Sequence, residues 1–129
     1  MTNPREYVVT QSKEDLGEFL RLVSVFDEDG FDRLFVRDDV KSGRSDAEFE
    51  GLHELLTEVI AEQRRAEQLI DAGELRVVSE RFDELVLLVY LHGSISGLLI
   101  TADATANVQE GLLFDHISSW PVEEVIEGA

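Results

Sequence analysis

The stretch Leu85-Val86-Leu87-Leu88-Val89-Tyr90-Leu91 decides the fold that this chain is expected to adopt. It is far shorter than a membrane span, which needs about 20 apolar residues, but it has the length of a strand. Because neighbouring residues of a strand point to opposite faces of a sheet, a continuous apolar run is buried on both faces. The stretch therefore predicts a central strand rather than an edge strand.

Two further strands are expected beside this one. Residues 74–82 alternate partially between apolar and polar side chains, and residues 98–102 are largely apolar. The loop Gly93-Ser94-Ile95-Ser96-Gly97 connects the central strand to the last one. A hydrolase nucleophile elbow needs serine at the centre of such a motif, and here the centre is Ile95. The glycines therefore indicate a hairpin loop.

An earlier hairpin is expected over residues 21–37. Asp29-Gly30 is a favoured two-residue turn because both residue types tolerate positive φ. This turn places Val25 opposite Leu34 and gives the hairpin one apolar face. A four-residue loop would instead place Asp32 opposite Val25 on that face, so we expect the two-residue register.

Three helices are expected, and two of them begin at clear capping signals. Asn3-Pro4-Arg5-Glu6 combines a capping asparagine with a proline suited to the first turn, and this helix ends near Gly17. Ser45-Asp46-Ala47-Glu48 is a capping box that opens a long helix, with Gly73 as its C-terminal cap. The third helix covers residues 106–119. The long helix has one stripe at helical spacing, formed by Phe49, Leu52, Leu56, Val59, Ile60, Gln63, Ala66 and Ile70.

The element order is α-β-β-α-β-β-β-α, which predicts an α+β protein with a five-stranded antiparallel sheet and three helices. Residues 38–45 are expected to form a polar loop between the hairpin and the long helix. We expect residues 1–121 to form a single α+β domain and residues 122–129 to form an acidic C-terminal tail.

This order resembles the roadblock/profilin-like fold, and the stretches Phe26-Asp27-Glu28-Asp29-Gly30 and Ser96-Gly97-Leu98-Leu99-Ile100 carry the resemblance. The resemblance implies a scaffold protein rather than an enzyme. It also implies a homodimer surface formed by the helix between the strand groups and the third strand. The unit that runs from Tyr7-Val8-Val9 to Val36-Arg37-Asp38-Asp39-Val40 is similar to small uncharacterised haloarchaeal proteins, a likeness that brings no function with it.

The chain is strongly acidic, with 28 Asp and Glu against 11 Lys and Arg and a formal net charge of -17. Such a charge opposes compaction at low salt. Molar salt shortens the Debye length to about 3 Å and removes most of this repulsion. We therefore expect a halophilic, haloarchaeal source. Binding to nucleic acid or to an anionic membrane is disfavoured, because both need a basic surface.

Composition also bears on the compartment and on the chemistry. The chain has no cysteine, which excludes disulfides, thiolate nucleophiles and thiolate-bound metals. Residues 1–5 lack the apolar core of a signal peptide, so we expect a cytoplasmic protein.

Three histidines are the candidates for metal chemistry. Glu50 and His53 are spaced to present two ligands from one face of the long helix, but a structural site normally needs two more. His92 ends the central strand, and His116 follows an aspartate on the last helix. We therefore expect no cofactor and no metal, and the more ordinary interpretation is that all three are surface or boundary residues.

Three functions remain open. The first is a non-enzymatic interaction or scaffold module that forms a homodimer, through a surface containing Glu50, His53, Thr57, Leu75 and Val77. The second is a small-ligand sensor or regulatory domain, with a pocket formed by Phe26, Phe35, Tyr90 and His92. The third, which the sequence favours least, is a metal-dependent enzyme built on the three histidines.

Overall fold

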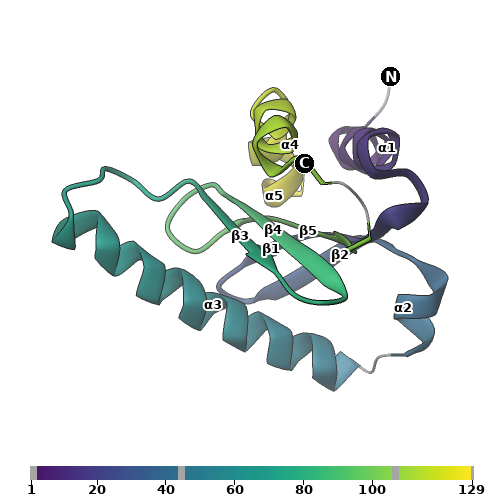
Figure 1. The fold of residues 1–129 in the computed structure, drawn as a ribbon, viewed down its shortest axis with the longest axis horizontal. Coiled ribbons are helices and arrows are strands. Elements are labelled where there is room, and N and C mark those ends of the chain that lie inside the picture. Colours follow the sequence, from purple (N-terminus) through teal and green to yellow (C-terminus); the bar gives the residue numbers. More distant parts are fainter. Residues whose placement is uncertain (1–2, 44–45, 106–107, 129) are drawn as a thin grey trace.

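The structure, a computed structural model, describes residues 3–43, 46–105 and 108–128. Its strands form one antiparallel sheet in the order β2-β1-β5-β4-β3 (Figure 1). The strands are β1 (Leu20–Asp27), β2 (Gly30–Val36), β3 (Val77–Arg81), β4 (Leu85–Leu91) and β5 (Gly97–Asp103). The helices are α1 (Pro4–Leu16), the 3-10 turn η1 (Gly17–Phe19), α2 (Asp38–Ser42), α3 (Asp46–Leu69), α4 (Glu110–Ile117) and α5 (Val122–Glu127). The predicted α+β class with a five-stranded antiparallel sheet is confirmed.

The sheet lies between two helical layers. The long helix α3 covers part of one face, and α1, α4 and α5 lie on the other (Figure 1). Side chains of β4 alternate between the two cores: Val86 and Leu88 join the cluster beneath α1, α4 and α5, and Leu87 and Val89 join the cluster beneath α3. β4 lies between β5 and β3, so the prediction of a strand buried on both faces is confirmed.

The predicted start and end of the first helix are confirmed. The side-chain oxygen of Asn3 accepts hydrogen bonds from the N–H groups of Arg5 and Glu6, at 2.8 and 3.3 Å. Gly17 ends the helix with a φ of 57°, a conformation that favours glycine. The predicted capping box of the long helix depends on Ser45, which lies outside the described residues.

The predicted register of the first hairpin is wrong. Asp27 pairs with Gly30, so Val25 faces Asp32 and not Leu34. The Asp27 carboxylate accepts hydrogen bonds from the N–H groups of Asp29 and Gly30, at 2.8 and 3.2 Å. The two turn residues are therefore residues 28 and 29, both with negative φ, as in a type I turn with aspartate first and glycine fourth. Leu34 is the extra residue of a β-bulge, which restores the apolar face further along β2.

Two short helices lie in segments that were expected to form a polar loop and an acidic tail. α2 forms within the predicted polar loop, residues 38–45, and buries Val40. α5 forms within residues 122–129, which were expected to be an acidic tail. It buries Val122 and Val125 in the core that α1 and α4 share with the sheet. The predicted third helix is also shorter than expected, since α4 covers eight residues. No helix in the described part of the chain is long and apolar enough to span a membrane.

Arg64 fixes the second half of α3 to the rest of the fold. Its Nε donates to the carbonyl of Ser94 at 2.7 Å, and its Nη2 donates to the carbonyl of Gly93 at 2.6 Å. Its Nη1 forms an ion pair with the Glu67 carboxylate at 3.2 Å. The same carboxylate accepts a hydrogen bond from the N–H of Leu75 at 2.7 Å. One side chain thus links α3 to the β4–β5 loop and, through Glu67, to the segment that leads into β3.

We expect Arg64→Ala to lower the free energy of unfolding by about 1.5 kcal/mol, because charge-assisted bonds to two carbonyls are lost. The matched control is Arg65→Ala, since Arg65 is largely exposed and pairs only with Glu62 among the contacts described. This control should cost less than about 0.5 kcal/mol. Urea unfolding followed by circular dichroism measures both, and equal effects would contradict the linking role of Arg64.

Candidate functional site

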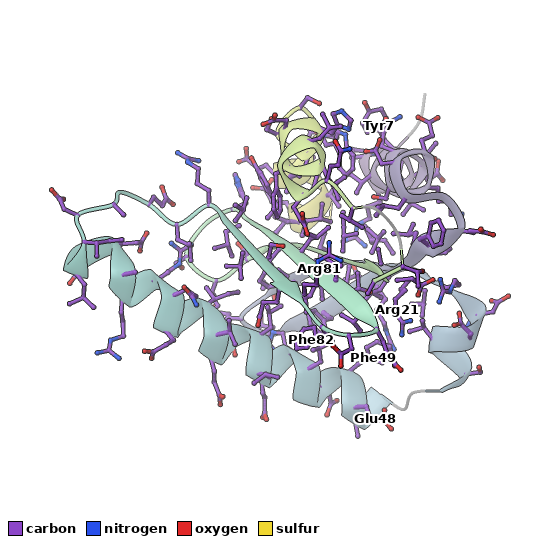
Figure 2. The ribbon with its side chains drawn as sticks, in the orientation of Figure 1. Tyr7, Arg21, Glu48, Phe49, Arg81 and Phe82 are labelled. Carbon is purple, nitrogen blue, oxygen red and sulfur yellow. The ribbon has the colours of Figure 1, made fainter. Side chains whose placement is uncertain are left out.

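An open, mainly apolar groove of about 720 Å³ lies between α3 and the β3–β4 hairpin. Phe49 of α3 and Phe82 of the hairpin both line it, and they lie at the same end of the molecule (Figure 2). Its other apolar lining residues are Leu22, Val40, Leu52, Leu55, Leu56, Val59, Leu85 and Leu87. Its polar lining residues are Arg21, Glu48, Glu80, Asp83, Glu84 and Thr101. We call this feature the groove.

The groove exists because α3 presents more apolar surface than its contact with the sheet covers. Leu56 and Ile60 are buried in the core beneath α3, but Leu55 is 57% exposed. Successive residues of a helix are rotated by about 100°, so Leu55 lies on the flank of α3 beside Leu56. Phe82, on the opposite wall, is 53% exposed. Large apolar side chains on both walls are typical of a surface that another molecule covers.

One edge of the sheet continues from the groove. The N–H of Leu91 donates to the carbonyl of Arg76, and the N–H of Phe82 donates to the carbonyl of Leu85, both at 2.8 Å. Because backbone groups alternate along an antiparallel strand, the intervening residues Val77, Ser79 and Arg81 turn their N–H and C=O groups away from β4. β3 therefore presents a regular strand edge that pairs with no other strand of the sheet.

The other edge strand, β2, is less suited to pairing with another strand. It contains the bulge at Leu34 and is followed directly by the short helix α2. Asp32 on this strand forms an ion pair with Arg5 of α1. Bulges and charges of this kind are the usual means by which proteins block an edge strand.

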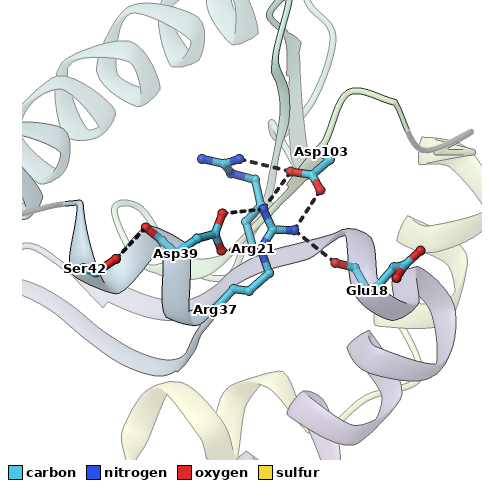
Figure 3. A network of polar contacts seen from close by, with 6 residues as sticks. All are labelled: Glu18, Arg21, Arg37, Asp39, Ser42 and Asp103. Atoms are coloured by element: carbon cyan, nitrogen blue, oxygen red, sulfur yellow. Dashed lines mark hydrogen bonds and ion pairs between the residues drawn. The ribbon is translucent and has the colours of Figure 1, made fainter.

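A polar network lies beside the groove and includes Arg21, which lines it (Figure 3). Arg37 uses all five of its N–H groups: it donates twice to Asp39, twice to Asp103 and once to the carbonyl of Glu18, at 2.6 to 3.0 Å. Arg21 donates from Nη1 to Asp103 at 3.0 Å and also lines the groove. Hydrogen bonds from Arg37, then from Arg21, hold the pKa of Asp103 below its usual value despite partial burial.

Arg21 reaches Asp103 because it lies at an irregularity of the sheet. Leu20 pairs with Ala102 and Leu22 pairs with Thr101, so Arg21 is the extra residue of a bulge between β1 and β5. The network therefore joins β1, β5, α2 and Arg37, the residue between β2 and α2, at one corner of the fold. Hydrogen bonds to Asp39, and then to Asp103, raise the pKa of Arg37 and keep its guanidinium charged.

The three histidines lie apart. The ring Nε2 of His53 is 2.7 Å from the carbonyl oxygen of Asp27, so Nε2 carries a proton and donates it. His116 of α4 pairs with Asp15 of α1 at 3.1 Å on the other face of the sheet, and His92 is exposed beyond the end of β4. The described residues contain no group of three or more His, Asp or Glu side chains that could hold a metal ion.

The residues predicted for the interaction surface divide between two places. Glu50 and His53 line a separate cavity of about 480 Å³ beside the β1–β2 hairpin. Thr57 lies on the same side, about 200° around α3 from Leu55, and its hydroxyl donates to the carbonyl of Glu54. Leu75 and Val77 lie in or near β3, at the other edge of the sheet. Leu55 and Phe82, which line the groove, were not among the predicted residues, although the position of Leu55 outside the predicted stripe was a usable signal.

The four residues of the predicted ligand pocket do not form one cavity. Phe26 is buried in the cluster beneath α3, whereas Phe35 and Tyr90 pack against the cluster on the opposite face of the sheet. His92 is exposed in the loop after β4. The sheet itself separates these side chains.

Comparison with known families and structures gives one family and one fold. The family model for a domain of unknown function, DUF7522, matches residues 6–120. The chain is similar to the structure of gliding protein MglB from Thermus thermophilus, with a TM-score of 0.70 and 18% identity over 100% of this chain and 95% of that one. It is also similar to Myxococcus xanthus MglB, with a TM-score of 0.66 and 15% identity over 98% and 91%.

A third structure, described as MglB with tetrameric arrangement, matches with a TM-score of 0.69 and 17% identity over 99% of this chain and 93% of that one. No curated protein matches the sequence. At these identities the likeness shows the fold alone. MglB proteins have a roadblock-like fold, so the predicted fold resemblance is confirmed.

Proposed function

The chain belongs to the DUF7522 family of domains of unknown function, and from that premise and the groove we propose that it is a non-enzymatic interaction module that works as a homodimer. A second copy covers the groove, and the β3 strands of the two copies pair edge to edge. The groove is the observation that carries this proposal, because it places an apolar wall of α3 beside an unpaired strand edge. The fold similarity to an MglB described as having a tetrameric arrangement supports self-association.

The occupant that fits the groove is the α3 helix of the second copy. A two-fold axis that pairs β3 with β3 brings each α3 toward the uncovered part of the sheet in its partner. The exposed side chains of Leu55 and Phe82 would then be buried in both copies. An interface with an apolar centre and continuous backbone pairing has the character of a stable homodimer.

The habitat and compartment also belong to the proposal. The net charge of -17 supports a halophilic, haloarchaeal protein that works in a salt-rich cytoplasm. The scaffold role is the function that the resemblance to the roadblock family implied. It needs neither a metal nor a cofactor.

Ser79→Pro tests the pairing of β3 edges. The N–H of Ser79 faces away from β4, so a proline there removes no bond of the isolated subunit, and edge strands tolerate such a proline. In a symmetric dimer the same change removes two hydrogen bonds and places two rings at the junction. We expect the dissociation constant of the dimer to rise about tenfold or more, measured by sedimentation equilibrium.

Ser79→Thr is the matched control, because it keeps the N–H group and favours a strand. It should dimerise as the unchanged chain does. Circular dichroism should show the same fold for both variants. A Ser79→Pro variant that dimerises as tightly as the threonine variant would exclude pairing through β3.

A further inference from the structure

We infer that assembly through the groove is controlled by cation concentration, because Glu80, Asp83 and Glu84 line the groove and form no ion pair with another described residue. This inference rests on the homodimer proposed above. Glu80, Asp83 and Glu84 line the wall of the groove formed by the β3–β4 hairpin. Within the described residues, none of these three carboxylates forms a salt bridge with a lysine, arginine or histidine.

The arrangement on the opposite face of the same hairpin is different. There Arg81 of β3 pairs with Glu110 of α4 at 3.1 Å. In the groove, the cation among the described lining residues is Arg21, and Asp103 already binds it at 3.0 Å. The hairpin thus presents a neutralised face to its own helices and an uncompensated acidic face to the proposed partner.

Two-fold symmetry intensifies this charge. In an isologous interface each patch meets the same patch of the other copy, so the three carboxylates on each wall become six in one interface. Glu80 is half-buried in the isolated chain, and covering the groove would remove more water from it. The overall charge of -17 on each chain adds repulsion at longer range.

Dissolved cations are then what reduces the repulsion between these carboxylates. The Debye length is about 10 Å at 0.1 M salt and about 3 Å at 1 M, so carboxylates several ångströms apart repel strongly in the first case and weakly in the second. The dimer should therefore form at molar potassium chloride and dissociate at low salt. Salt also strengthens burial of apolar surface, so salt dependence alone does not identify the carboxylates as its cause.

A pair of charge-matched variants separates the two causes. Glu80→Gln with Glu84→Gln removes two charges from the groove. Glu50→Gln with Glu54→Gln removes two charges from the side of α3 that lines the cavity beside the β1–β2 hairpin. Both variants keep side-chain size and change the net charge equally. Dissociation constants are measured by sedimentation equilibrium from 0.1 to 3 M potassium chloride.

For the unchanged chain we expect the dissociation constant to fall at least about tenfold across this range. The Glu80/Glu84 variant should dimerise at 0.1 M salt and lose most of the salt dependence, while the Glu50/Glu54 variant should behave as the unchanged chain does. Equal salt dependence in all three proteins would overturn the inference. A dimer that is insensitive to salt would overturn the inference but leave the proposed function intact, whereas monomers at every salt concentration would overturn both.

Discussion

Gly97→Ala should cost about 3 kcal/mol of folding free energy, the largest effect that we expect from a single added methyl group. Gly97 opens β5, between Phe26 of β1 and Leu91 of β4. A Cβ there would lie 2.3 Å from the carbonyl oxygen of Tyr90 and 3.1 Å from the ring of Phe26. The carbonyl belongs to the backbone of β4, so it can move only if the pairing of two central strands is disturbed.

The measurement is the midpoint of thermal unfolding, which should fall by roughly 10 °C for a chain of this size. Gly51→Ala is the control, because Gly51 is exposed on α3 and an added Cβ would meet no atom within 4 Å. That substitution should raise stability by about 0.5 to 1 kcal/mol, since glycine is a poor helix former. A Gly97→Ala variant as stable as the unchanged chain would show that β4 and β5 are not packed as described.

Asp103→Asn should cost about 2 to 3 kcal/mol, because it removes the carboxylate shared by Arg21 and Arg37. Removing one partner of a buried charge pair typically costs 3 to 5 kcal/mol. The expected value is lower because a quarter of the Asp103 side chain is exposed, so solvent screens the pair. Urea unfolding at pH 7 measures the loss, and a difference below about 0.5 kcal/mol would mean that the network contributes little.

The same network gives the effect of this substitution a defined pH dependence. The folded-state pKa of Asp103 lies below its unfolded value, mainly because Arg37 donates hydrogen bonds to its carboxylate. Its stabilisation is therefore complete above the unfolded pKa, near 4, and is lost as the pH falls through the folded pKa. The stability difference between the unchanged chain and Asp103→Asn should be constant from pH 5 to 8 and shrink below pH 4. A difference that grew on acidification would contradict the sign of this shift.

The sequence was sufficient to predict an element where one local physical signal dominated. The uninterrupted apolar run of β4 predicted its bounds and its interior place in the sheet, because a strand without polar residues is buried on both faces. Asn3, Pro4 and Gly17 predicted the first helix, because each acts through its own backbone or its nearest neighbours. The α+β order followed from these local signals and from the rule that sequential strands form hairpins.

The sequence was insufficient where distant contacts decide the outcome. The hairpin register depends on how the Asp27 side chain binds two backbone N–H groups, and alternation alone favoured another pairing. The apolar residues Val122, Val125 and Ile126 have helical spacing. The surrounding glutamates and the preceding Pro121 nevertheless favoured the interpretation of this segment as an acidic tail. The bulge that turns Arg21 toward Asp103 breaks the period of β1, so no pattern in the sequence indicated the network.

The predicted interaction residues and the proposed groove involve the same helix and neighbouring parts of the sheet, but different side chains. Glu50 and His53 line the cavity beside the β1–β2 hairpin, whereas Leu55 lines the mainly apolar groove beside the β3–β4 hairpin. Which flank of α3 lies over the core depends on how the helix crosses the sheet, and this angle follows from packing rather than from the stripe itself.

The unequal edges of the sheet limit how many chains strand pairing can join. The bulge at Leu34 and the ion pair of Asp32 obstruct β2, while β3 is regular. A sheet that can be extended at both edges has no natural end and grows into a fibre. A sheet that can be extended at one edge is complete after a single addition, because the added copy presents only its obstructed edge. The irregularity of β2 thus protects a very apolar sheet from open-ended polymerisation.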